Sequence, residues 1–373
     1  MSTMEERRPR ILGQQLRAAR EGLALSVEDV LEQLGTDPHT LIDWENDVSE
    51  PPLRELWRLA ELYRRSTDYF LAVTPPRPSQ IQFRLTKWRS MSQLPLGARQ
   101  ALAQFEELCR VATHLESLAK ERQRIRFSPR PQASNPEALA RSERLRLGLD
   151  ERPVKKLRDR LEDQGVWVFE IPVPDNAFSG FSWWHSNYGP CVLVNAREIA
   201  GRRAFTLSHE YAHLLHGSGP SVCALWASMP EERFADRFAA AFLMPDADVD
   251  REFSKRDISR VSPDIQQVRP LAHRYEVSVE AMVRKLGDIG LLDRQTAQEL
   301  LASGEPKAEH LRRPKAPSWR RRLGGRYVTL ATRAHAKGQL STGKLAEYLY
   351  IDIRTAQTLL PQEQQSPTVG SNG

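Results

Sequence analysis

The sequence lacks the features that would place the protein in a membrane or in an oxidising compartment. It has no run of 18 or more apolar residues, so no membrane-spanning helix is expected. Residues 1–8 lack the apolar core of a secretory leader. The 3 cysteines, Cys109, Cys191 and Cys223, are far apart and odd in number, which indicates reduced thiols. We therefore expect a cytoplasmic protein with no membrane contact.

The composition is that of an ordinary globular chain. Hydrophobic residues make up 40% and charged residues 27% of the 373 positions, which favours two or three folded domains. The net charge of +6 is mild, so it permits contact with nucleic acid without indicating it. No internal repeat is evident.

A His-Glu-x-x-His pattern at residues 209–213 carries the clearest chemical signal. The stretch 205–216 has helical spacing, and Gly217 ends it. On a helix, His209 and His213 lie one turn apart on the same face and can bind one metal ion. Glu210 is then beside the ion as the proton acceptor for a water molecule.

A second helical stretch, residues 231–245, offers a third ligand. Glu232 precedes Asp236 by one turn, so Glu232 can bind the ion while Asp236 braces a ligating histidine. Glu231 is the competing ligand, but no Asp follows it at that spacing. Zinc is the expected ion, and manganese fits the same nitrogen and oxygen donors.

These stretches, with residues 180–184 and 190–195 before them, resemble the ImmA/IrrE family of metallopeptidases. The resemblance implies a gluzincin-like site with His209, His213 and Glu232 on the metal and Glu210 as general base. It also implies site-specific cleavage of a transcriptional repressor, often a small helix-turn-helix protein, in a stress or mobile-element response.

Residues 8–74 read as short helices with a Gly-containing turn, and they resemble the XRE/Cro-type helix-turn-helix domain. The recognition stretch 37–50 has five acidic residues and no Lys or Arg, and those carboxylates would be repelled by phosphates. Two readings stay open. The domain binds operator DNA through its basic N-terminal arm, Arg17, His39 and Thr40, or it is a protein-interaction module.

The predicted fold class is α+β and mostly helical, with a helix-turn-helix bundle, a zincin-like core with a small sheet, and a C-terminal helical region. We expect six segments along the chain: the helix-turn-helix domain at 8–74, a helical connector at 79–127, the peptidase core at 137–250, a helical lobe at 251–303, a basic linker at 304–326 and a C-terminal helical domain at 327–361. The long amphipathic helix at 97–123 is expected to pack within the chain or to form a homodimer. Residues 312–326 are interpreted as a solvated linker, with phosphate contact as the alternative.

Strands are predicted at 166–171, 179–184 and 191–194, and residues 180–184 are the candidate edge strand for an extended substrate. His185 and Tyr211 are expected on the surface, and the alternative is that they polarise a substrate carbonyl. His216 is expected in a structural role or beside a metal ligand. Cys223 is expected in the core, and the alternative is a position near the metal. Two functions follow. The first is a metal-dependent endopeptidase that regulates transcription by cleaving a repressor. The second is a DNA-binding regulator whose peptidase-like domain is a sensor.

Overall fold

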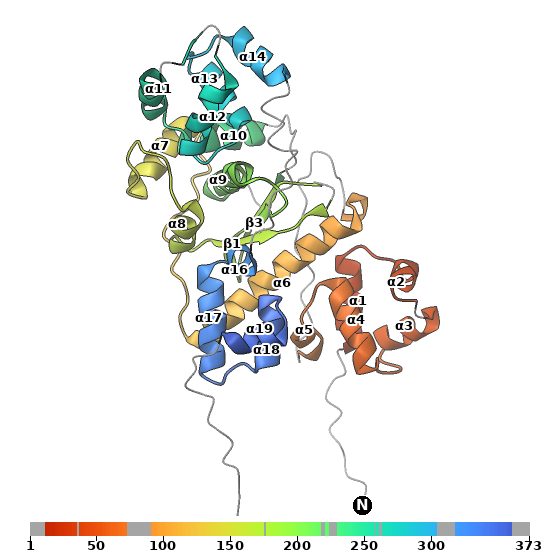
Figure 1. Cartoon of the computed structure of the whole chain (residues 1–373). Helices are drawn as coiled ribbons and strands as arrows, with labels where there is room; N and C mark the ends of the chain where they lie inside the picture. The colour runs from red at the N-terminus through yellow and green to blue at the C-terminus, as the bar shows by residue number, and fades with distance from the viewer. Residues whose placement is uncertain are drawn as a thin grey trace, which may run out of the picture.

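The computed structural model describes residues 12–35, 37–72, 91–174, 177–217, 221–223, 230–256, 258–260, 263–303 and 318–359. Within these segments the chain is mostly helical and has one four-stranded sheet (Figure 1). This is the predominantly helical α+β architecture that the sequence predicts. None of the described helices is long and apolar enough to cross a membrane. The basic N-terminal arm and most of the expected linker at 304–326 lie outside the described residues.

Five helices form the N-terminal bundle: α1 (Leu12–Gly22), α2 (Val27–Leu34), α3 (Pro38–Glu45), α4 (Leu53–Tyr63) and α5 (Thr67–Leu71). Ser26 caps α2 and Gly35 ends it with a φ of 63°, as the sequence predicts. α1 and α3 approach closely at Gly13, where a Cβ atom would lie 2.6 Å from the carbonyl oxygen of Glu45. The predicted helix-turn-helix layout is therefore confirmed.

The sheet contains β1 (Trp167–Ile171), β2 (Gly180–His185), β3 (Gly189–Asn195) and β4 (Ser221–Cys223), in the order β1-β3-β2-β4. β1 is parallel to β3, and β2 is antiparallel to both of its neighbours. The prediction that residues 180–184 form an edge strand is wrong. β2 pairs with β3 on one side and, through Gly180, Phe181 and Ser182, with β4 on the other. β4 is the terminal strand.

The sheet packs against α6 (Leu96–Ala119), α8 (Leu157–Asp163) and α9 (Ala200–His216). α10 (Pro230–Leu243) packs on the other side of α9, and α7 (Pro136–Arg146) packs on α10. Side chains alternate between the two faces of each strand. Val168 and Val192 belong to the apolar core that includes α9 and α10. Phe169 belongs to the opposite core, where Phe105 of α6 meets it edge-on at a ring distance of 6.2 Å. α6 therefore packs within the chain, which was one of the two roles expected for the helix at 97–123.

Four C-terminal helices complete the core beneath the sheet: α16 (Trp319–Leu323), α17 (Gly325–Ala336), α18 (Thr342–Leu349) and α19 (Ile353–Thr358). Tyr327 of α17 lies edge-on to Phe169 of β1 at a ring distance of 5.7 Å. The prediction of a solvated linker as far as residue 326 is wrong for its last part, because Leu323 is buried in this core.

The N-terminal bundle is attached to both α6 and the C-terminal helices. The backbone N–H of Thr67 donates to Glu347 Oε1 at 2.7 Å, and the hydroxyl of Tyr348 donates to Asp68 Oδ2 at 2.6 Å. The backbone N–H of Ser66 donates to Glu107 Oε1 of α6 at 3.1 Å. Segments about 280 residues apart in the sequence are thus joined at the start of α5.

A helical lobe packs above the sheet layer: α11 (Asp246–Lys255), α12 (Ile265–Arg274), α13 (Val279–Asp288) and α14 (Arg294–Ala302). The hydroxyl of Tyr275 donates to Asp248 Oδ2 at 2.7 Å and joins α11 to the end of α12. Gly201 lies so close to the segment before α13 that a Cβ atom there would be 2.5 Å from the carbonyl carbon of Val277. The lobe is therefore in direct contact with the beginning of α9.

Candidate metal centre

α9 positions the two histidines of the His-Glu-x-x-His pattern. The helix extends from Ala200 to His216, and Gly217 ends it in the left-handed conformation at a φ of 70°. Its second half is buried between the sheet and α10, so His209 and His213 are only 2% and 3% exposed. Both imidazoles are therefore held in place by packing, on the helix face that the spacing predicts.

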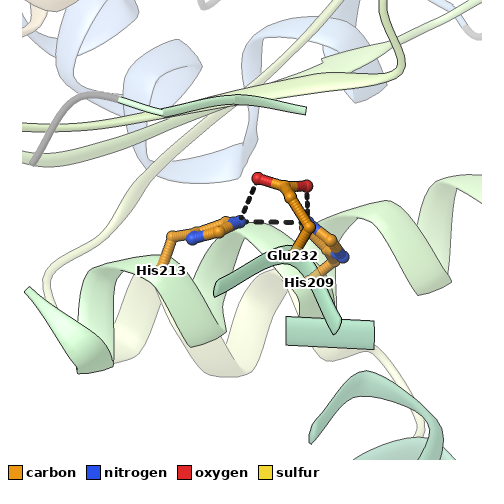
Figure 2. Close-up of side chains that lie close together, drawn as sticks. All are labelled: His209, His213 and Glu232. Carbon is orange, nitrogen blue, oxygen red and sulfur yellow. Dashed lines mark hydrogen bonds and ion pairs between the residues drawn. The ribbon is translucent and has the colours of Figure 1, made fainter. Parts of the chain in front are cut away.

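Three donor atoms from α9 and α10 point toward one another (Figure 2). His209 Nε2 lies 3.0 Å from His213 Nε2 and 3.2 Å from Glu232 Oε2. His213 Nε2 lies 3.4 Å from Glu232 Oε1. Ligands about 2.1 Å from a tetrahedrally coordinated ion are roughly 3.4 Å apart. The three side chains that the sequence singles out thus come together with the spacing that a divalent ion requires.

Asp236 lies one turn after Glu232 on α10 and contacts His209. Its Oδ1 is 2.9 Å from His209 Nδ1. When Nδ1 donates its hydrogen to this carboxylate, Nε2 keeps its lone pair for an ion. Glu231, the competing candidate, does not belong to the three-residue group found among the described residues.

The surroundings favour the protonation states that bind metal. Burial lowers the pKa of His213 below its ordinary value of 6.5, which keeps the imidazole neutral. Burial would raise the pKa of Glu232, but hydrogen bonds to His209 and His213 outweigh it and lower the pKa to about 2. A neutral imidazole at His213 and an ionised carboxylate at Glu232 fit a divalent cation.

Glu210 is fully buried and lies against the beginning of β2. A Cβ atom on Gly180 would be 2.7 Å from Glu210 Oε1 and 2.6 Å from Thr206 Cγ2. Glycine at this position therefore allows α9 to approach the strand. The sequence motifs do not show that position 180 must be a glycine, because the need for a residue without a Cβ atom arises only when α9 lies against the strand.

A buried carboxylate that the sequence motifs do not identify joins β2 to α9. The hydroxyl of Ser179 donates to Glu198 Oε1 at 2.6 Å, and the hydroxyl of Thr206 donates to Glu198 Oε2 at 3.3 Å. Burial raises the pKa of Glu198 above its ordinary value. These bonds hold Ser179, the residue just before β2, close to Thr206, which lies one turn before Glu210 on α9. The link is tertiary, so no spacing in the sequence predicts it.

Other polar residues near the motif have structural surroundings. Tyr211 was expected on the surface, but it is buried and its hydroxyl donates to Glu143 Oε2 at 2.9 Å. The ring of His216 lies 5.0 Å from that of Phe234 on α10, in keeping with a structural role. Nδ1 of His185 accepts the backbone N–H of Asn187 at 3.1 Å, within the turn after β2. The side chain of Cys223 lies outside the described part of the chain.

The N-terminal bundle neutralises part of the positive charge that the sequence places there. Glu45, one of the five acidic residues of the recognition stretch, is buried and forms a two-pronged ion pair with Arg20 at 2.7 and 2.8 Å. Arg17 is 45% exposed and donates to Asn46 Oδ1 at 2.5 Å. Of the other predicted DNA contacts, His39 is exposed and Thr40 is half-buried. These residues are accessible, but Arg17 is already in contact with the end of α3.

Comparison with known families agrees with this geometry. Residues 161–287 match the IrrE N-terminal-like domain of the peptidase M78 family, and residues 13–74 match a helix-turn-helix domain. A search among curated proteins found no match for the chain. The matched segments include β1–β4 and α9–α13 in one case and α1–α5 in the other. The chain therefore combines a helix-turn-helix domain with a metallopeptidase-like domain.

Proposed function

We propose that the protein is a metal-dependent endopeptidase that regulates transcription by cleaving a repressor protein, with a helix-turn-helix domain in the same chain. The observation that carries this proposal is the convergence of His209, His213 and Glu232 beside the buried Glu210. The match to a peptidase domain over the same residues supports it. Zinc is the proposed ion, and manganese suits the same donors.

His209, His213 and Glu232 would hold the ion, with Asp236 fixing the ring of His209. The bound ion supplies Lewis acidity that polarises a peptide carbonyl and acidifies water. Glu210 would accept the proton of the attacking water and pass it to the nitrogen of the leaving amine. Its burial against Gly180 keeps bulk water away from that carboxylate.

A protein substrate in extended form is proposed to pair with β4. Strand addition at the end of a sheet provides backbone hydrogen bonds that do not depend on the side chains of the substrate. β4 is the terminal strand in the order β1-β3-β2-β4 and follows α9 directly in the chain. The proposal moves the substrate-binding strand from β2, where the sequence placed it, to β4.

The test is a cleavage assay on purified full-length protein. Elemental analysis first measures the metal content, and candidate helix-turn-helix repressors are then incubated with the protein with and without a chelator. The proposal expects about one ion per chain and cleavage that a chelator stops and added zinc or manganese restores. A chain that binds neither metal, or cleavage that continues unchanged in chelator, contradicts it.

A second candidate function is a DNA-binding regulator whose peptidase-like domain is a sensor. It is favoured by the firm attachment of the N-terminal bundle to the rest of the chain through Thr67, Asp68, Glu347 and Tyr348. Such contacts can transmit a change in one part to the other. Operator DNA affinity measured with and without metal tests it, because a sensor predicts a difference and an independent protease does not.

A further inference from the structure

The segment between α6 and α7, residues 120–130, crosses the edge of the sheet layer and is fixed by its backbone. Arg126 N–H donates to the carbonyl oxygen of Gln164 at 3.0 Å, just after α8. Arg130 N–H donates to the carbonyl oxygen of Leu215 at 2.5 Å, near the end of α9. We call residues 120–130 the basic strap. Its position relative to the body is therefore set at two points.

Alternate residues of the strap face the protein. Gln123 donates a side-chain hydrogen bond to the carbonyl oxygen of Glu162. Ile125 lies so close to Gly165 that a Cβ atom on that glycine would be 2.9 Å from Ile125 Cα. Phe127 is buried, and its ring lies 5.3 Å from the ring of Trp184. Gln123, Phe127 and the backbone at Ile125 thus anchor the strap.

Between residues 120 and 126, the even-numbered positions of the strap are cationic and exposed: Lys120, Arg122, Arg124 and Arg126. Within the described part of the chain, none of these four side chains forms a hydrogen bond or an ion pair. The single acidic residue of the strap, Glu121, is paired with Arg333 of α17 at 2.9 Å. The exposed Lys337 lies one turn further along α17. The outward side of the strap is therefore positively charged, and acidic side chains neutralise little of that charge.

This arrangement is unfavourable in the free protein. Residues two positions apart in an extended segment are about 7 Å apart. That distance is below the Debye length of about 8 Å at physiological ionic strength, so Arg122, Arg124 and Arg126 repel one another. Because the hydrogen bonds of the Gln123 side chain and of the Arg126 backbone N–H hold the strap in place, the repulsion persists until an anion neutralises it. The fixed spacing indicates a partner with charges in a row.

We propose that the basic strap binds the phosphate backbone of a nucleic acid without reading its sequence. Protein interfaces have an apolar and aromatic centre, whereas Phe127 of the strap is buried and Ile125, at 39% exposure, is the single large apolar side chain that the strap presents to solvent. Guanidinium groups match phosphate oxygens in a two-pronged geometry, and arginine holds three of the four outward positions. The observations therefore favour a phosphodiester chain over an acidic protein.

The strap is distinct from the helix-turn-helix domain. That domain packs on the first half of α6, where Arg99 donates to the carbonyl oxygen of Leu23 at 2.7 Å. The strap begins at the other end of α6, and the 24 residues of this helix extend about 36 Å. Figure 1 shows the bundle and the segment after α6 on opposite sides of the molecule. The proposal also stands independently of the metal centre.

The test compares full-length protein with the variant R122Q/R124Q/R126Q in binding to a labelled duplex of random sequence, measured by fluorescence anisotropy. Each lost phosphate contact lowers the salt dependence of binding, so the slope of log K against log salt should fall by about 2.7. Affinity at low salt should fall about 100-fold, equally for other duplex sequences. Unchanged affinity and slope overturn the proposal.

A matched control removes three exposed arginines elsewhere that form no ion pair with the described residues, in the variant R141Q/R197Q/R294Q. An equal loss of affinity in this control attributes binding to net charge and overturns the proposal. Poly-glutamate is the second probe. If the strap variant loses poly-glutamate binding as much as DNA binding, the surface docks acidic protein instead. Should the triple variant unfold, R124Q alone should lower the slope by about 0.9.

Discussion

Gly180 of β2 and Glu210 of α9 lie so close that a methyl group on the glycine would be 2.7 Å from the carboxylate oxygen Oε1. This contact joins the sheet to the residue proposed as general base. Ser179 and Glu198 hold the strand in that position from one side. The orientation of the Glu210 carboxylate therefore depends on a strand that contributes no ligand of its own.

Replacement of Gly180 by alanine should disturb this contact. Forced overpacking in a buried site costs about 1–3 kcal/mol, so the free energy of unfolding should fall by that amount, as measured in urea. Cleavage should fall as well, because Glu210 must shift. Gly22→Ala is the control, since a Cβ atom there meets nothing within 4 Å. Equal stability of the two variants would contradict the close approach.

Glu210→Gln should separate metal binding from turnover. The substitution keeps the size of the side chain but removes the proton acceptor, so cleavage should fall about 100- to 10,000-fold. Metal content should stay the same, because the three proposed ligands are intact. Elemental analysis and the repressor assay measure the two quantities. Glu151→Gln, an exposed neutralisation on another surface, should change neither. Full cleavage by Glu210→Gln would remove it from the mechanism.

The choice between Glu232 and Glu231 as ligand is tested on α10. Glu232→Ala should abolish metal binding, because its carboxylate lies 3.2 Å from His209 Nε2 and 3.4 Å from His213 Nε2. Glu231→Ala should leave most of the metal binding intact. Asp236→Asn should weaken affinity about 10- to 100-fold by loosening His209. Titration with zinc in competition with a chelator measures the zinc affinity of all three variants. If Glu231→Ala abolished metal binding and Glu232→Ala did not, Glu231 would be the ligand.

Acidification should weaken the attachment of the N-terminal bundle. Burial would raise the pKa of Glu107, but a hydrogen bond and the charge of Arg110, together with Arg65, outweigh it and lower the pKa to about 2. A folded pKa below the ordinary value of 4.5 stabilises the fold above pH 4.5. That contribution, about 3 kcal/mol, is lost as the pH falls from 4.5 toward 2.

Urea unfolding at pH 6 and at pH 3 measures this loss for the natural chain and for Glu107→Gln. The variant should be less stable at pH 6, because Arg65 and Arg110 lose a buried partner. It should also lose less stability on acidification than the natural chain. An identical pH dependence for both proteins would show that Glu107 does not titrate in this range.

The helices with strong local signals could be predicted from the sequence. Ser26 and Gly35 delimit α2, and Gly217 ends α9, because caps and stops depend on neighbouring residues. The pairing of His209 with His213 also follows from spacing within one helix, and the choice of Glu232 follows from Asp236 one turn later and from the family resemblance. These features require little knowledge of the tertiary fold.

Features that depend on distant contacts could not be predicted. Glu45 has the composition of a surface residue, but its burial is explained by Arg20, 25 positions earlier. Tyr211 is polar, but Glu143 on another helix satisfies its hydroxyl inside the core. The edge strand was misplaced because β4 has only three residues, too few for a periodic signal. In each case tertiary packing supplies the partner that the local sequence lacks.

The position of α17 has a consequence for the order of events during synthesis. Tyr327 packs on Phe169, so the face of the sheet that α6 covers in part is completed only after the ribosome has released residues far beyond the peptidase-like segment. During synthesis, Phe169 and Phe105 must therefore be kept from aggregating while α9 and α10 are already complete. We expect this side of the sheet to gain its full stability only after α17 has emerged from the ribosome.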